Sequence, residues 1–218
     1  MFRTNMVNAK ACATLCLPYQ RLLKDDGIPF DNPFLYQSIV GALQYLTFTR
    51  PDIAFSFHQV CQFMQKPMLD HFTAVKQILR YLKGSCHYGL TFQKGSLDLT
   101  AFSDADWAGD PNDRRSTTGL VVFLGSNPVS WSSKNQHTVS RSSTEAEYRA
   151  LSTTSAELDW IKQLLVFLQV PILQPPVLLD NLSAIALSFN FVQHQRTKHI
   201  EIDFPMGYRD LLSSTSGS

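Results

Sequence analysis

The sequence lacks long apolar runs and an excess of either charge. No stretch of the 218 residues approaches the roughly 20 apolar residues of a membrane span, and the N-terminus has no apolar core of a signal peptide. Nineteen basic residues are matched by eighteen acidic ones, so the net charge of +1 gives no whole-molecule attraction to nucleic acid. We therefore expect a soluble, intracellular protein that recognises its partners through local patches.

Cysteine is scarce as well. The chain has four, and no second Cys or His pair follows Cys12 and Cys16 at the spacing of a zinc site. This pattern favours reduced thiols over a zinc site. What the sequence does contain is enough apolar residues, 44%, for one large domain or two small ones.

The chain changes character along its length. Residues 1–33 show little periodicity and end in the turn-rich "DDGIPFDNPF", so we interpret them as a linker or a cut edge of a longer chain. Residues 34–94 hold three apolar patterns of helical period, separated by Pro51 and Pro67. These patterns predict a small helical bundle.

The third of these helices is unusual in its charge. From His71 to Leu97 there are four Lys or Arg residues and no Asp or Glu, and Lys76, Arg80 and Lys83 share one helix face. A solvated surface is one reading of this face. The other is a track for a phosphate backbone.

Residues 95–210 have the texture of a mixed α/β domain. The segments "LDLTAFSD", "TTGLVVFLG" and "NPVSWSS" predict three antiparallel strands, followed by a long helix over about 143–169 and the buried strand "PPVLLD". A short helix, "LSAIALSF", and an irregular end come after it. We predict a mixed sheet flanked by helices, and a disordered tail at 211–218.

The long helix contains two glutamates with different predicted roles. Ser142 precedes Glu145 by three residues, the spacing of a capping box, so Glu145 has a structural role. Glu147 instead continues an apolar stripe, and we expect it to face the sheet with Leu151, Thr154, Leu158, Ile161, Leu165 and Leu168. Glu145 is expected on the wetter side, with Arg149, Ser152, Ala156, Asp159 and Gln163.

Two aspartates end predicted strands. Asp104 closes what reads as a buried strand and Asp180 closes "PVLL", so both should lie at the carboxyl edge of the sheet that Glu147 crosses. Three carboxylates in reach of one another need a cation, and oxygen-only ligands favour Mg²⁺ or Mn²⁺. The matching reaction is two-metal phosphoryl transfer. Taken singly, Asp104 and Asp180 are equally typical of turn and helix caps.

The order of the motifs resembles a known family. The segments "YQSIVGALQYLTFTRPDIAFSFHQV", "HFTAVKQILRYLKG", "FSDADWAGD", "DRRSTTGLVVFLG", "SWSSKNQHTVSRSSTEAEYRAL", "LLDNLSAI" and "RTKHIEID" resemble, in this order, the end of the reverse transcriptase region and the ribonuclease H region of plant Ty1/copia-type retrotransposon polyproteins. The likeness runs from about Gly27 to Asp203. It implies a ribonuclease H fold with catalytic, metal-binding carboxylates at Asp104, Glu147 and Asp180. It also implies that the helices of 34–84 correspond to the polymerase thumb and connection.

The chain departs from that family at both ends. The polymerase fingers and palm, with their paired aspartates, would lie upstream, so we expect no copying of nucleic acid. After Asp203 the sequence diverges from the pattern, and we expect the last strand, the last helix and the fourth carboxylate to be missing. Such a loss would weaken or abolish metal-dependent cleavage.

The resulting hypothesis is an endonuclease that cuts the RNA strand of RNA/DNA hybrids, acting alone or with the rest of a retroelement polyprotein. A non-catalytic hybrid-binding module and a non-functional relic are the alternatives. Besides the basic face of the third helix, backbone contacts are predicted from the start of the long helix, the preceding strand and one loop. These candidates are Ser142, Ser143 and Thr144, then Lys134 and Gln136, then Arg114 and Arg115. For each, a solvated surface role is the competing interpretation.

Overall fold

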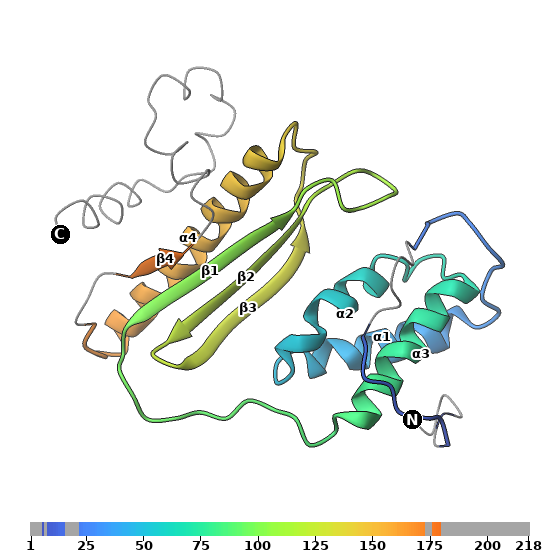
Figure 1. Ribbon diagram of the computed structural model, residues 1–218, viewed down its shortest axis with the longest axis horizontal. Coiled ribbons are helices and arrows are strands. Elements are labelled where there is room, and N and C mark those ends of the chain that lie inside the picture. Colours follow the sequence, from blue (N-terminus) through green and yellow to red (C-terminus); the bar gives the residue numbers. More distant parts are fainter. Residues whose placement is uncertain (1–5, 7, 16–21, 173–175, 180–218) are drawn as a thin grey trace. The chain divides into compact units, whose positions relative to one another are not determined.

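Helices fill the first part of the chain and a sheet with one long helix fills the second (Figure 1). The computed structural model describes residues 6, 8–15, 22–172 and 176–179. The chain divides into a helical unit, Met1–Leu90, and a sheet unit, Thr91–Ser218. The division falls after Leu90, four residues before the boundary expected from the sequence. Within the described residues, no helix is long and apolar enough to cross a membrane.

The helical unit holds the three predicted helices: α1 (Pro33–Leu46), α2 (Ala54–Cys61), which follows a 3₁₀ turn at Pro51–Ile53, and α3 (Leu69–Gly84). Helix α1 begins where the Asn32 side chain accepts the Leu35 N–H (2.9 Å) and Pro33 occupies the first turn. The apolar stripes meet in one core of Tyr36, Ile39, Val40, Leu43, Val60, Phe63, Phe72, Val75, Ile78 and Leu79. The predicted bundle is therefore confirmed.

The described part of residues 1–33 is not a free linker. The Phe30 N–H donates to the Pro67 carbonyl (2.9 Å), and the Leu69 N–H donates to the Ile28 carbonyl (2.8 Å). Met6 is buried in the core of the helical unit, and apolar residues between positions 9 and 30 pack against it. The linker interpretation is wrong for these residues because their apolar side chains complete that core.

His71 gives the helical unit a predicted pH dependence. The ring is 1% exposed and stacks on Phe63 at 3.8 Å between centroids; its Nδ1 accepts the Met68 N–H (3.0 Å), so Nε2 carries the proton that reaches the Leu23 carbonyl (2.9 Å). Burial lowers the pKa of His71 below its ordinary 6.5, against opposing effects of the Leu23 hydrogen bond and Asp70. The folded state therefore resists a proton that the unfolded state accepts.

Because the unfolded chain binds that proton first, the free energy of unfolding should fall as the pH drops below about 6.5, by up to about 1.4 kcal/mol per pH unit from this group. Urea unfolding between pH 7.5 and 5, followed by the amide signals of α3, measures the slope. His71→Gln should show a shallower slope in that window. An unchanged slope in the variant would assign the pH dependence to other groups.

The sheet unit contains β1 (Leu99–Asp106), β2 (Thr117–Leu124), β3 (Asn127–Asn135), α4 (Ser143–Phe167) and β4 (Val177–Leu179). The sheet has the order β3-β2-β1-β4, with β1 antiparallel to β2, β2 antiparallel to β3, and β4 parallel to β1. This confirms the predicted mixed α/β fold, with α4 packed along one face (Figure 1). Strand β1 lies between β2 and β4, and β4 pairs with its residues Thr100, Ala101 and Phe102.

Alternation along the strands defines the two faces of the sheet. Toward α4, the core consists of Leu99, Ala101, Leu120, Val122, Leu158 and Ile161. On the other face, Phe102 is 45% exposed and meets Phe123 edge to face at 5.9 Å. The β2–β3 hairpin turns at Gly125, where φ is +59° and a Cβ would come within 2.3 Å of the Ser96 carbonyl oxygen. Only glycine fits that turn without strain.

Candidate active site

Three alanines bring the start of α4 close to β1. Ala105 of β1 packs against Ala146 and Ala150 of α4 in a small buried cluster. Because alanine side chains are short, helix and strand approach closely here. Asp104 directly precedes Ala105 in β1, and Glu147 directly follows Ala146 in α4. Both carboxylates are therefore neighbours of this contact in the sequence, but in a strand the residue next to the inward-facing Ala105 points to the opposite face of the sheet.

Asp104 is exposed, contrary to the expectation of a buried strand end. The strand continues to Asp106, and its alternation directs Ala101 and Ala105 toward α4, leaving Asp104 on the other face with Phe102. The residue opposite Asp104 in β2 is Gly119, and a Cβ there would meet nothing within 4 Å. The carboxylate of Asp104 therefore lies beside open space.

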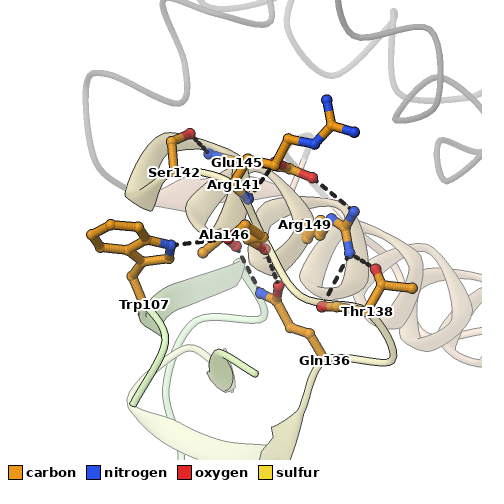
Figure 2. Close-up of polar contacts among 9 residues, drawn as sticks. Trp107, Gln136, Thr138, Arg141, Ser142, Glu145, Ala146 and Arg149 are labelled. Carbon is orange, nitrogen blue, oxygen red and sulfur yellow. Dashed lines mark hydrogen bonds and ion pairs between the residues drawn. The ribbon is translucent and has the colours of Figure 1, made fainter. Parts of the chain in front are cut away.

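Glu145, the first glutamate of α4, is arranged differently from the prediction (Figure 2). Glu145 is 8% exposed, so its expected place on the wetter side is wrong; its carboxylate accepts the Arg141 N–H (2.8 Å) and pairs with Arg149 (2.8 Å). The capping function explains this burial, since the Ser142 hydroxyl also accepts the Glu145 N–H (3.1 Å). The guanidinium compensates the buried charge.

Glu147 is half-buried, and its Oε2 atom is buried. The stripe that it was predicted to continue is buried at Leu151, Thr154, Leu158 and Ile161, but Leu168 at the helix end is 57% exposed. Ser152, predicted on the wetter side, is buried. The first turns of α4 are thus enclosed on more than one face, which a single stripe does not describe.

The donor set suits a hard cation. Asp104 and Glu147 offer carboxylate oxygens only, which fits Mg²⁺ or Mn²⁺ better than zinc. Asp180, the predicted third ligand, lies outside the described residues. Among the residues that are described, no three His, Cys, Asp or Glu side chains form a group able to hold a metal ion.

The basic face of α3 is partly covered by the chain's own N-terminal segment. Arg80 Nε donates to the Lys10 carbonyl (2.9 Å) and Lys83 Nζ to the Ala9 carbonyl (2.9 Å). Lys76 lies over the Phe72 ring, 4.7 Å from its centroid. Residues 9–14, which we call the strap, therefore occupy donor groups that were predicted to contact phosphate; that contact stays a prediction.

Gln77 anchors the strap, and its removal is expected to loosen it. Its Nε2 donates to the Thr14 carbonyl (2.8 Å) and to Cys12 Sγ (3.0 Å). Hydrogen bonds from Thr14 and then Gln77 lower the pKa of the Cys12 thiol to about 7. In Gln77→Leu, the pH midpoint of Cys12 alkylation should rise, as measured by mass spectrometry. Lys76→Ala is the matched control, because the Lys76 ammonium lies over the Phe72 ring of the same helix. Equal midpoints in both variants would contradict the anchor.

The predicted contacts around α4 have mixed outcomes. Gln136 is 8% exposed and bonded to Thr118, Ser140 and Ala146, so the expectation of a nucleic-acid contact is wrong. Ser142 is occupied as the helix cap, and Ser143 and Thr144 begin the first turn. The exposed cations are Lys134, Arg114, in the left-handed region at φ +61°, and Arg115, paired with Asp113 at 3.3 Å. Their contact with nucleic acid stays a prediction.

Sequence reasoning missed two residues next to the candidate site. The Trp107 indole N–H donates to the Ser140 carbonyl (3.2 Å), which ties the loop after β1 to the segment before α4. Asp110 is 7% exposed and accepts from the Asn112 N–H (2.8 Å) and the Asn135 side chain (3.0 Å). Both residues lie in the segment "FSDADWAGD". The signal available for Asp110 was its residue type, since Asp side chains commonly order loops by accepting the backbone N–H two residues further on.

Comparison with known proteins identifies the family. The chain is 49% identical to the Retrovirus-related Pol polyprotein from transposon RE1 of Arabidopsis thaliana and 39% identical to that from transposon TNT 1-94 of Nicotiana tabacum, in each case over 93% of its length. An uncharacterized mitochondrial protein of Arabidopsis thaliana is 56% identical over 60% of the chain and 55% of its own length.

The chain spans only 14% and 16% of those two polyproteins. No protein-family model and no solved structure matches it. The alignments with these polyproteins nevertheless cover 93% of the chain at 39–49% identity, which is enough to assign its family. It belongs to the Pol polyproteins of Ty1/copia-type retrotransposons.

Proposed function

We propose that this retroelement-derived chain carries a ribonuclease H domain, a Mg²⁺- or Mn²⁺-dependent endonuclease that hydrolyses the RNA strand of RNA/DNA hybrids. The observation behind the proposal is the end of β1. There Asp104 is exposed on β1, Gly119 leaves open space beside it, and the alanine contact brings the start of α4 against the same strand, with Asp104 on the face of β1 that is turned away from α4.

Each part of this arrangement has a chemical use. An exposed carboxylate can reach a cation that also contacts a phosphate, and a glycine inside a strand often marks the close approach of a ligand. Asp104, Glu147 and Asp180 would hold the ions, which would activate water and stabilise the leaving oxygen of the phosphodiester. Exposed Arg114, Arg115 and Lys134 would contact phosphates, while 2′-OH groups would mark the RNA strand.

The test is cleavage of a labelled RNA/DNA hybrid in Mg²⁺ and in Mn²⁺. The unaltered chain should cut the RNA strand, and Asp104→Asn should lose more than about a hundredfold in rate, beyond the 10–100-fold typical of residues that only support metal ligands. Gly119→Val should keep the fold, since valine favours strands and meets open space, but should obstruct the substrate.

Two other outcomes would replace the proposal. Binding of the hybrid that weakens with salt, without cleavage in either metal, would indicate a non-catalytic hybrid-binding module. A chain that neither binds nor cuts the hybrid would be a relic of the element. Equal cleavage by Asp104→Asn and the unaltered chain would remove Asp104 from the site.

A further inference from the structure

A polar network joins the loop after β1, strand β2 and the first turn of α4. Gln136 Nε2 donates to Thr118 Oγ1 (3.1 Å), and Gln136 Oε1 accepts from Ser140 Oγ (2.9 Å). Gln136 Nε2 also donates to the Ala146 carbonyl (2.8 Å; Figure 2). The Ser140 carbonyl in turn accepts the Trp107 indole N–H (3.2 Å). The side-chain amide of Gln136 is thus shared among three elements, and both of its N–H groups are used.

The network lies beside the candidate carboxylates. Trp107 follows β1 three residues after Asp104, and Ala146, which Gln136 holds, immediately precedes Glu147. Ala105 and Ala146 are in the same buried cluster. Any shift of the first turn of α4 would therefore move Glu147 relative to β1.

The rest of α4 does not depend on this network. Leu158 and Ile161, three or more turns further along, pack in the main apolar core of the sheet unit. Ser130 of β3 separately bonds Glu157 of α4 (2.6 Å). Loss of the network should therefore loosen the first turn locally while the helix stays attached to the sheet.

We propose that Gln136, assisted by Trp107, is a positioning residue that sets the place of Glu147 for a divalent cation. The inference rests on the proposed function and deepens it. Gln136 acts through the Ala146 carbonyl, and Trp107 acts through Ser140. Residues that orient metal ligands in this way typically change metal affinity 10–100-fold when they are removed.

The experiment compares Gln136→Met, similar in size but unable to make these bonds, with Ser130→Ala, which removes a sheet-to-α4 bond far from Glu147. Mn²⁺ binding to the full chain is measured by electron paramagnetic resonance, and amide hydrogen exchange is measured over residues 145–150. Gln136→Met should weaken Mn²⁺ binding about tenfold and speed exchange in the first turn. Ser130→Ala should lower the melting temperature without either effect.

Trp107→Phe is a second variant, which keeps an aromatic ring and removes only the indole N–H. Trp107→Phe should also weaken Mn²⁺ binding, but by less than Gln136→Met does. Equal Mn²⁺ affinity in Gln136→Met and the unaltered chain, or equal weakening by Gln136→Met and Ser130→Ala, would overturn the positioning role alone. Absence of Mn²⁺ binding by the unaltered chain would overturn the proposed function, and the inference with it.

Discussion

Replacing Glu147 with glutamine is expected to reduce hybrid cleavage more than about a hundredfold, while Glu145→Gln, two residues away, leaves cleavage largely intact. Glu147 follows the Ala146 contact with β1 and has a buried Oε2 atom. Glu145 is already engaged by Arg149 and by the Arg141 N–H, so its charge is not available to a metal ion. The two substitutions remove the same charge from the same helix and differ only in position.

The measurement is the rate of RNA-strand cleavage by the unaltered chain, by Glu147→Gln and by Glu145→Gln, at saturating Mg²⁺ and in Mn²⁺. The free energy of unfolding is measured beside the rates, because Glu145→Gln breaks the mostly buried ion pair with Arg149 and should lower it. A cleavage rate of Glu147→Gln within a few fold of the unaltered chain would exclude Glu147 as a metal ligand. Loss of cleavage in Glu145→Gln alone would transfer that role to Glu145.

The elements with a regular apolar period were predictable from sequence. Helix α3 repeats apolar residues at helical spacing, and Val75, Ile78 and Leu79 are buried as that spacing requires. The three antiparallel strands follow from short β-branched segments between turn residues, and the sheet order adds only β4 beside β1. Regular periods are local properties of the chain, which is why sequence alone specifies them.

The candidate site was harder because capping and long-range contacts compete with periodicity. The stripe that passes through Leu158 and Ile161 was extended back to Glu147, but the first turns of α4 also bury Glu145, Tyr148 and Ser152. At Glu145 the segment before α4 is responsible, because the Arg141 N–H and the Ser142 hydroxyl bond Glu145, and Gln136 bonds the adjacent Ala146 carbonyl. No periodic pattern encodes a contact made by an irregular segment.

The basic face of α3 shows the same limit. Helical spacing correctly grouped Lys76, Arg80 and Lys83, with the apolar residues on the opposite side. It did not reveal that backbone carbonyls of the strap, some 70 positions earlier, accept hydrogen bonds from Arg80 and Lys83. Each carbonyl uses one donor of a side chain that has several, so a phosphate at Arg80 or Lys83 would share that side chain with the strap.

Replacing Arg149 with methionine is expected to lower the free energy of unfolding of the sheet unit by about 2–3 kcal/mol. The side chains of Arg149 and Glu145 are only 16% and 10% exposed, and Arg149 also donates to the Thr138 carbonyl (3.4 Å) and hydroxyl. Removing one partner of a buried pair leaves the other charge uncompensated, a loss that reaches 3–5 kcal/mol for fully buried pairs. Partial exposure reduces it.

A double-mutant cycle with Glu145→Gln separates the ion pair from packing. Because the double variant leaves no buried charge, it should recover about 1–2 kcal/mol of the loss seen in Arg149→Met. All three tryptophans of the chain, Trp107, Trp131 and Trp160, belong to the sheet unit, so urea unfolding followed by tryptophan fluorescence reports on this unit. Additive losses in the double variant would mean that Glu145 and Arg149 stabilise α4 independently, and that burial of Glu145 depends on the Arg141 N–H and the Ser142 cap.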